Sequence, residues 1–371
     1  MKTIQHSFAV LLATTLAGLF ASTVVAAPYQ KGDIQLQSIG PLAIGPDGIL
    51  LVSDPKAASV IAIQTNAKPS DKAGESFNIK QLDAKVAAVL GASVDQVRII
   101  DLTVDTASQT AYLSVVRGQG ASANPTVVSV QPGGTIKVMP LKGVHHAVAK
   151  LTNAPADRET GNGRRRRNQR MESITDLAFV KGQVIVAGLS NEEFSSTLRT
   201  LPFPFEGSHK GAGVKIFHGA HGRYETSSPV RTFVSYNIDG APHILAAYTC
   251  TPLVKIPMVE LKPGSQVVGE TIAELGNRNR PLDMIVYRKN GKDHLLMANS
   301  SRGVMKIKTE KLGNYKGITD KVPGGETKGV PYETLADWTE VRQLAELDGQ
   351  HALVVRGTED DGLNLEAVRL P

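Results

Sequence analysis

His243-Ile-Leu-Ala-Ala-Tyr-Thr-Cys-Thr-Pro-Leu-Val-Lys-Ile256 and His294-Leu-Leu-Met-Ala-Asn-Ser-Ser-Arg-Gly-Val-Met-Lys-Ile307 are two copies of one pattern, 51 residues apart. A third copy begins at His351-Ala-Leu-Val-Val-Arg-Gly-Thr358. Each copy follows a short turn signal that is typical of a tight β-hairpin, namely Asp239-Gly240, Asn290-Gly291 and Asp348-Gly349. The repeat therefore predicts a series of units that each consist of a strand, a tight turn and a second strand.

Three earlier segments follow the same pattern with a looser sequence, at residues 42–54, 101–115 and 176–187. The six turn centres lie near positions 48, 108, 182, 240, 291 and 349. Intervals of roughly 50 to 75 residues fit one four-stranded blade per unit. The sequence therefore predicts an all-β fold, a six-bladed β-propeller that residues 27–371 form as a single domain.

The ends of the repeat array predict how the ring closes. The last unit ends at Leu370 with little room for a fourth strand, and Asp33–Ser38 precedes the first unit without a partner. We therefore expect this N-terminal strand to complete the last blade, because closure removes exposed sheet edges. Two alternatives stay open: a seven-bladed ring with a degenerate blade within residues 66–96 or 313–340, and two stacked β domains.

The blade units resemble those of the six-bladed NHL and SMP-30/gluconolactonase-like propellers. The similar segments are Leu42–Asp54 and Pro281-Leu-Asp-Met-Ile-Val286, which have the strand and glycine-turn pattern of that group. The resemblance implies a ring with a central channel. For the lactonases of the group it also implies one divalent metal ion, held in the channel by Glu, Asn and Asp ligands. The first inner strand, Pro41-Leu-Ala-Ile44, has no acid for that role.

The N-terminal residues have the pattern of a secretory signal peptide over residues 1–26. Lys2 is followed by an apolar run from Phe8 to Phe20 and by the small-residue pattern Val24-Val25-Ala26. This run of about 13 residues is shorter than the ~20 that span a bilayer. We therefore expect an exported protein, periplasmic or secreted, without a transmembrane segment.

The composition excludes several classes of protein. A chain of 371 residues with 41% hydrophobic and 20% charged residues is neither disordered nor a multi-span membrane protein. The formal net charge of +6 is mild and indicates solubility rather than nucleic-acid binding. Cys250 is the only cysteine, so an intramolecular disulfide is impossible.

In a propeller, the innermost strand A of each blade lines the channel. We call the face on which the chain enters strand A the top face, and the loops between strands B and C lie on it too. Three acids, Asp101, Asp176 and Asp283, stand at equivalent positions where strand A is expected to begin. They are interpreted either as ligands of one divalent cation, Ca²⁺ first of all, or as acceptors of backbone N–H groups that hold the inner strands.

The residues after strand B, together with those before strand A of blade five, are the candidates for ligand binding on the top face. They are chemically varied: Tyr248, Asn299, Arg302, Arg280, Arg356, Glu193 and Cys250. Cys250 is interpreted as a ligand or nucleophile if exposed, and as an inert core residue if buried. His218 and His221 form an H-x-x-H pair, which alone is a weak metal signal.

Three other segments depart from the repeat. Ile79–Leu90 predicts a short helix, and Val144–Leu151 is expected to be another. Residues 154–172 predict an inserted loop. Its basic residues are Arg164, Arg165, Arg166, Arg167 and Arg170. The loop is interpreted either as an arm that attracts anions over the top face near blade three, or as a solvated loop.

Three functions fit these observations. The first, which we favour, is a binding protein whose top face holds a small anionic ligand or an acidic protein partner. The second is a metal-dependent hydrolase of lactonase or esterase type, in which Asp101, Asp176, Asp283 and Asn299 hold a divalent ion. The third is a structural scaffold in an exported assembly. No catalytic motif decides whether the chain is an enzyme.

Overall fold

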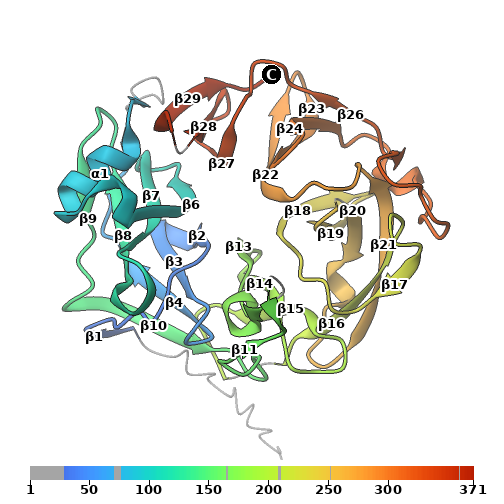
Figure 1. The fold of residues 1–371 in the computed structure, drawn as a ribbon, viewed down its shortest axis with the longest axis horizontal. Coiled ribbons are helices and arrows are strands. Elements are labelled where there is room, and N and C mark those ends of the chain that lie inside the picture. Colours follow the sequence, from blue (N-terminus) through green and yellow to red (C-terminus); the bar gives the residue numbers. More distant parts are fainter. Residues whose placement is uncertain (1–28, 71–76, 164–165, 208–209, 251, 359) are drawn as a thin grey trace, which may run out of the picture.

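The strands of the computed structural model pair into antiparallel sheets that surround one axis (Figure 1). The structure describes residues 29–70, 77–163, 166–207, 210–250, 252–358 and 360–371. The predicted signal peptide, Arg164 and Arg165 lie outside these residues. The pairings group most of the described strands into six blades, numbered here in chain order, and the predicted propeller is confirmed.

The blades contain the following strands, given from strand A outward. Blade 1 consists of β2 (Leu42–Ile44), β3 (Ile49–Asp54), β4 (Ser59–Gln64) and β10 (Val144–Lys150), with β1 (Gln30–Gly32) at its edge. Blade 2 consists of β6 (Val97–Asp105), β7 (Thr110–Arg117), β8 (Asn124–Val130) and β9 (Ile136–Val138). Blade 3 consists of β13 (Asp176–Val180), β14 (Gln183–Leu189), β15 (Ser196–Pro202) and β16 (Ala212–His218), and β17 (Arg223–Glu225) pairs with β16.

The second half of the chain supplies the other three blades. Blade 4 consists of β18 (Thr232–Ile238), β19 (Ala241–Ala247), β20 (Pro252–Pro257) and β21 (Gln266–Glu274), and β25 (Lys328–Gly329) pairs with β21. Blade 5 consists of β22 (Pro281–Lys289), β23 (Lys292–Asn299), β24 (Gly303–Lys308) and β26 (Tyr332–Thr334). Blade 6 consists of β27 (Val341–Glu346), β28 (His351–Thr358), β29 (Gly362–Arg369) and β5 (Asn78–Ile79).

The tight turns between strands A and B have the backbone conformation that the repeat predicts. Asp239 and Gly240 have φ values of 51° and 80°, and Asn290 and Gly291 have values of 51° and 76°. Two successive left-handed residues form the hairpin turn that fits the twist of the strands. At the third predicted turn, Asp348 instead accepts the N–H groups of Gln350 and His351 with its carboxylate.

The apolar cores show which blades are neighbours, because each core joins the facing sides of two blades. Blades 1 and 2 share one core, and blades 2 and 6 share another. Further cores join blade 6 to blade 5, blade 5 to blade 4, blade 4 to blade 3, and blade 3 to blade 1. The order around the ring is therefore 1–2–6–5–4–3 and differs from the order along the chain (Figure 1).

This order requires the chain to return past blade 1 on its way from blade 2 to blade 3. Val144–Lys150 makes that return as β10, which pairs with β4 at the outer side of blade 1. The segment is a strand and not the predicted helix. Its side chains alternate from residue 147 to residue 150, because Ala147 and Ala149 are buried whereas Val148 and Lys150 are exposed. This period of two fits a sheet edge rather than a helix.

Strand β5, which lies between blades 1 and 2 in the chain, closes the ring. It pairs with β29 and completes blade 6, whereas β1 pairs with β10 in blade 1. The expectation that Asp33–Ser38 completes the last blade is therefore wrong in detail. The predicted helix is confirmed as α1 (Leu82–Leu90), whose Leu82 and Val86 pack between blades 2 and 6. Residues 66–96 and 313–340 add strands to existing blades and form no seventh blade among the described residues.

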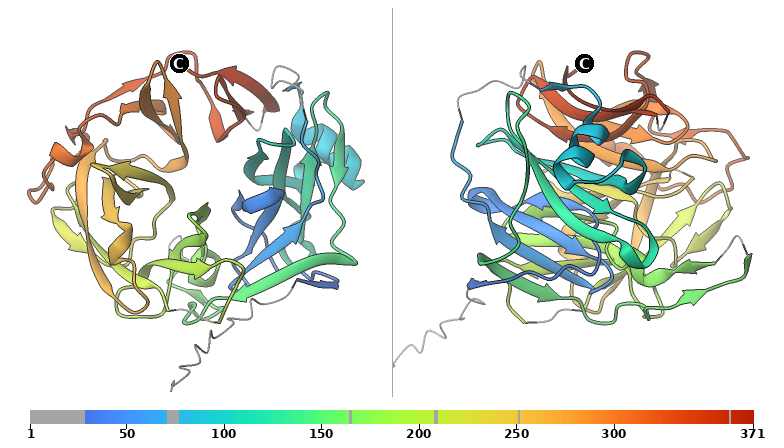
Figure 2. Two further views of the ribbon diagram at one scale, coloured as in Figure 1. Left: turned by 180° about the vertical axis from the view of Figure 1, so that it is seen from behind. Right: turned by 60° about the vertical axis from the view of Figure 1, so that its left-hand side comes forward.

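The inserted segment contains a small separate sheet, β11 (Glu159–Thr160) and β12 (Arg167–Asn168). Short 3-10 helices complete the described elements at Pro46–Gly48, Val94–Gln96, Gly120–Ser122, Gln169–Glu172, Met258–Glu260 and Leu312–Asn314. Within the described residues, no helix has the length and apolar character needed to cross a membrane. The inner strands surround the same axis when the ring is seen from behind (Figure 2).

Candidate functional site: the channel and its mouth

The channel between the inner strands has a volume of about 420 Å³, and Asp101, Asp176 and Asp283 line it. Asp101 lies in β6, Asp176 begins β13 and Asp283 lies in β22. In β6 and β22 a β-bulge directly precedes the acid. A bulge changes the direction of the following side chain. The prediction that the three acids occupy equivalent positions on the channel is confirmed.

Each carboxylate holds two blades together. The backbone N–H of Leu42 in blade 1 donates to Asp101 Oδ2 at 2.7 Å. The N–H groups of Phe233 in blade 4 and Leu344 in blade 6 donate to Asp176 and Asp283, each at 2.8 Å. The other oxygen of Asp176 and of Asp283 accepts the N–H of the next residue in its own strand.

These bridges are spaced regularly around the ring. Along the chain the acids lie irregularly, in blades 2, 3 and 5. In the ring order 1–2–6–5–4–3 they occupy every second position, and each acid bridges to the neighbour on the same side. The three carboxylates therefore form an approximate three-fold arrangement that links the six inner strands in pairs.

The narrow channel changes the protonation of these acids. Burial raises the pKa of Asp101 and of Asp176 to about 7. Burial, followed by the charge of Asp101, raises the pKa of Asp283 well above its usual range. The acids are therefore largely protonated below neutral pH, and they repel one another when they ionise.

The geometry does not favour coordination of one Ca²⁺ by all three acids. Among the described residues, the set of three His, Cys, Asp or Glu side chains whose ligand atoms all lie within 4.8 Å of one another consists of His218, His221 and Cys250. The channel acids are not such a set. Their oxygens instead accept backbone N–H groups, which is the second of the two interpretations from the sequence.

The mouth of the channel on the top face carries two arginines at the entries to inner strands. Arg231 precedes β18, and Arg280 precedes β22. Arg231 donates to Glu172 Oε1 at 2.8 Å and to Thr249 Oγ1 at 3.0 Å, so its guanidinium group is fixed. Arg280 is exposed, and its guanidinium group has no hydrogen bond or ion pair with any described residue. Partial burial and then the charge of Arg231 lower the pKa of Arg280. The two arginines precede β18 and β22, which are neighbouring inner strands.

Two of the predicted ligand-binding residues are structural. Tyr248 is 0% exposed and belongs to the core between blades 3 and 4, so it cannot contact a ligand on the top face. Asn299 is 5% exposed. Its amide NH₂ donates to the Met297 and Gly303 carbonyl oxygens and its oxygen accepts from Asn279, so both ends of the amide are engaged within the protein.

The other predicted ligand-binding residues do not gather at one point. Arg302 lies near the mouth and donates to the Asn277 carbonyl at 3.4 Å. Arg356 pairs with Glu366 at 3.7 Å in blade 6. Glu193 is exposed between blades 3 and 4, where Gln266 donates to it. The structure therefore brings Arg280 and Arg302 to the side of the mouth at blade 5, and separates Arg356 and Glu193 from them.

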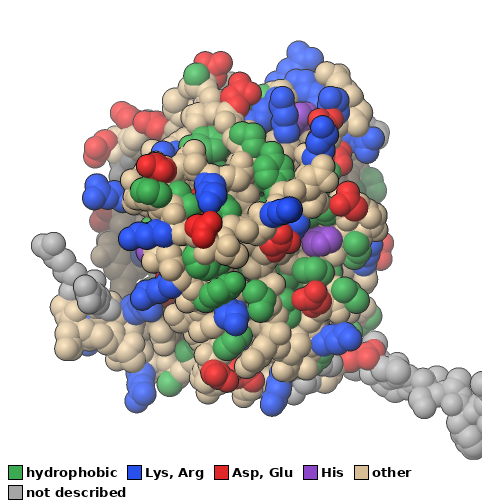
Figure 3. All heavy atoms as spheres, turned by 90° about the vertical axis from the view of Figure 1, so that its right-hand side faces the viewer, with side chains coloured by type: hydrophobic (Ala, Val, Ile, Leu, Met, Phe, Trp, Pro, Cys, Tyr) green, Lys and Arg blue, Asp and Glu red, His purple; other side chains and the backbone are tan. Residues whose placement is uncertain are grey.

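The β11–β12 part of the basic loop lies beside blade 3 at the outside of the ring, where β11 is labelled, and not over the channel (Figure 1). Arg166 is paired with Glu159, and Arg167 is exposed in β12. Arg170 donates to the backbone carbonyl groups of Pro155 and Lys56 and holds the insertion against blade 1. On the outer edge of the ring near blades 4 and 5, basic and acidic side chains are scattered among neutral ones (Figure 3).

Sequence reasoning missed Glu172 and Arg231. Arg231 directly precedes an inner strand, as Arg280 does, so the same positional rule applied to basic residues would have found it. Glu172 lies four residues before Asp176 in a 3-10 helix and has no signal of its own in the sequence.

No protein-family model matches the chain, and no curated protein matches it either. An aldose sugar dehydrogenase from Streptomyces coelicolor, solved with PQQ bound, is 12% identical with a TM-score of 0.33, over 92% of this chain and 97% of that chain. A streptogramin B lyase is 8% identical with a TM-score of 0.31, over 91% of this chain and 97% of that chain. A chain of a mitotic checkpoint complex is 11% identical with a TM-score of 0.39, over 99% of this chain and 100% of that chain. No function follows from likenesses of this size. The pairing of its own strands shows that the chain is a β-propeller.

Proposed function

We propose that the chain is an exported propeller that binds a small anionic ligand at the channel mouth, with Arg231 and Arg280 as the anion-binding groups. The observation that carries this proposal is the imbalance of charge at the mouth. Arg231 and Arg280 stand at the entries to the neighbouring inner strands β18 and β22, and Glu172 is the carboxylate paired with Arg231. A carboxylate or phosphate group bound between the two arginines would relieve their repulsion.

The arrangement suits recognition of a small anion for two further reasons. Arg231 is held by Glu172 and Thr249, so little side-chain entropy is lost when it binds a ligand. Below neutral pH the channel acids are largely protonated, so they do not cancel the positive charge above them. We therefore expect anion affinity to fall as the pH rises through 7.

The proposal is tested by titrating the protein with inorganic phosphate, sulfate and citrate at low ionic strength and measuring the heat of binding. Arg280→Gln is expected to weaken the binding of the best of these anions by about 10-fold, the loss of one charge-assisted contact. Arg369→Gln is the matched control, because it removes the same charge from an exposed position at the opposite face. Equal effects of the two substitutions, or no binding by the unsubstituted protein, would refute an anion site at the mouth.

A further inference from the structure

We propose that His218, His221 and Cys250 form a binding site for Zn²⁺ on the top face of blade 4. Each residue offers one ligand atom, an imidazole nitrogen or the Cys250 Sγ, and these three atoms all lie within 4.8 Å of one another. His218 ends β16, His221 lies in the turn before β17, and Cys250 lies in the loop between β19 and β20. Neither the channel acids nor the arginines of the mouth belong to this group.

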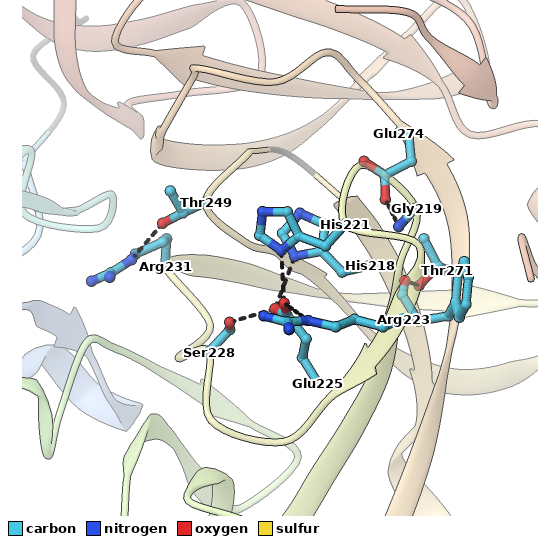
Figure 4. A network of polar contacts seen from close by, with 11 residues as sticks. His218, Gly219, His221, Arg223, Glu225, Ser228, Arg231, Thr249, Thr271 and Glu274 are labelled. Atoms are coloured by element: carbon cyan, nitrogen blue, oxygen red, sulfur yellow. Dashed lines mark hydrogen bonds and ion pairs between the residues drawn. The ribbon is translucent and has the colours of Figure 1, made fainter. Parts of the chain in front are cut away.

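Glu225 in β17 orients both imidazole rings. His218 Nδ1 lies 2.9 Å from Glu225 Oε2, and His221 Nδ1 lies 2.7 Å from Oε1. The ring centroids are 3.9 Å apart. In Figure 4 the second nitrogen of each ring points away from Glu225. One carboxylate therefore presents the two Nε2 atoms on the same side.

The hydrogen bonds to Glu225 also determine which ring nitrogens carry protons. Both Glu225 oxygens lie within hydrogen-bond distance of a ring Nδ1, and a carboxylate oxygen accepts. Each Nδ1 must then be the donor. In the tautomer with its proton on Nδ1, an imidazole ring has its lone pair on Nε2. A carboxylate behind a metal-binding histidine is the usual arrangement for fixing this tautomer.

His218 supplies an independent sign that a ligand belongs here. The residue is 2% exposed, and its Nε2 is buried without a hydrogen-bond partner among the described residues. A buried acceptor without a partner costs about 1–3 kcal/mol. A metal ion on Nε2 would remove that cost, and nothing else in the described structure does.

The position of Cys250 is also determined by its surroundings. Its backbone has a φ of 65°, a left-handed value that is uncommon for cysteine. The Cys250 N–H donates to the Asn279 carbonyl oxygen at 2.8 Å, and Asn279 is itself buried and bonded to the loop after β23. The thiol is thus held next to the imidazoles by blade 5, and it is partly exposed.

The donor set identifies the class of metal. Two imidazole nitrogens and a thiolate suit Zn²⁺, and they do not suit Ca²⁺ or Mg²⁺, which prefer oxygen ligands. Ligand atoms around a tetrahedral Zn²⁺ lie roughly 3.3–3.8 Å apart, given bonds of about 2.0–2.3 Å. Small side-chain shifts reach this geometry from separations within 4.8 Å. His221 is 44% exposed, so the fourth position of the metal ion is open to solvent or to a ligand.

The site is tested by titrating the full chain, freed of metal, with Zn²⁺ and with Co²⁺. We expect one Zn²⁺ per chain with micromolar or tighter affinity, and a Co²⁺–thiolate charge-transfer band in the near-ultraviolet spectrum. Cys250→Ser should abolish that band, and His221→Ala should weaken Zn²⁺ binding by about 100-fold or more. His145→Ala is the control, because it removes an exposed histidine in blade 1. Ca²⁺ should compete with neither ion.

Glu225→Gln tests the orienting role separately, and we expect a 10–100-fold loss of Zn²⁺ affinity while the thiolate band of the Co²⁺ form persists. Because His218→Ala removes a buried side chain, circular dichroism must first show that this variant is folded. Stoichiometric Zn²⁺ that survives in the Cys250→Ser and His221→Ala double variant would overturn the site, as would binding seen only at millimolar Zn²⁺. Neither outcome depends on Arg280, so failure here is distinguishable from failure of the anion site.

Discussion

The channel acids and the His218–His221–Cys250 group are both clusters of potential metal ligands, but they differ in what their lone pairs already bind. Asp176 and Asp283 accept backbone N–H groups with both oxygens. In the His–Cys group, Glu225 is hydrogen-bonded to Nδ1 of each ring, and the buried Nε2 of His218 has no partner among the described residues. Unused lone pairs, and not the number of ligand-type residues, therefore indicate a metal site.

The two regions also differ in symmetry. The three acids recur at every second position of the ring and make the same inter-blade bridge each time. The His–Cys group and the two mouth arginines occur on one side of the ring, at blades 3 and 4 and at the entry to blade 5. A feature that repeats with the fold serves the fold, and a feature that breaks the repeat is the better candidate for function.

Asp176→Ala should have the largest effect. It leaves the N–H groups of Leu177 and Phe233 without an acceptor and removes the bridge between blades 3 and 4. We expect the free energy of unfolding to fall by roughly 2–4 kcal/mol, measured by urea denaturation. The exposed Asp337 provides the control, because Asp337→Ala should change stability by no more than about 0.5 kcal/mol. If both variants are equally stable, the acids do not hold the blades together.

The pH dependence of stability is expected to be smaller. The pKa of Asp176 rises from 3.8 to about 7 on folding, because burial disfavours its charged form. The folded chain then binds more protons than the unfolded chain between these values, so stability is greatest on the acid side and falls as the pH rises toward 7. We expect a decrease of about 2.5 kcal/mol between pH 5 and pH 8 that is attributable to Asp176.

The measurement compares unfolding of the unsubstituted chain and Asp176→Asn over that pH range. The amide does not titrate, so the variant should show the shallower slope, although its NH₂ group faces a backbone N–H and lowers stability at every pH. Parallel pH profiles of the two proteins would mean that Asp176 titrates normally and that the channel does not desolvate it.

The sequence revealed local features of this fold and not its long-range order. Asn290-Gly291 predicts its hairpin because the two residues adopt left-handed φ values at little cost, which is a property of the dipeptide. The ring order could not be predicted, because it depends on which apolar blade faces pack together. Strand β10 alternates buried and exposed residues only in relation to β4, which lies 80 residues or more away in the chain.

The candidate site was predictable to a similar degree. The equivalent positions of the three acids follow from the repeat, and so does the top-face location of Cys250. The repeat does not predict that Cys250 lies beside His218 and His221. Their proximity depends on the parallel pairing of β16 with β21 of the next blade, which places the histidines next to blade 4. Glu225 gave no signal either, because its role depends on the turn between β16 and β17.

The smallest predicted effect concerns Gln343, which extends the bridging pattern to a fourth junction. It follows a β-bulge in β27, as Asp101 and Asp283 follow bulges in their strands, and its Nε2 donates to the Ile100 carbonyl of blade 2 at 2.9 Å. This bridge is one hydrogen bond between two uncharged groups. Gln343 Oε1 is buried without a partner among the described residues. We therefore expect Gln343→Ala to cost about 1 kcal/mol in urea denaturation, less than Asp176→Ala. A loss as large as that of Asp176→Ala would show that position in the ring, and not the two accepting oxygens, accounts for the strength of a bridge.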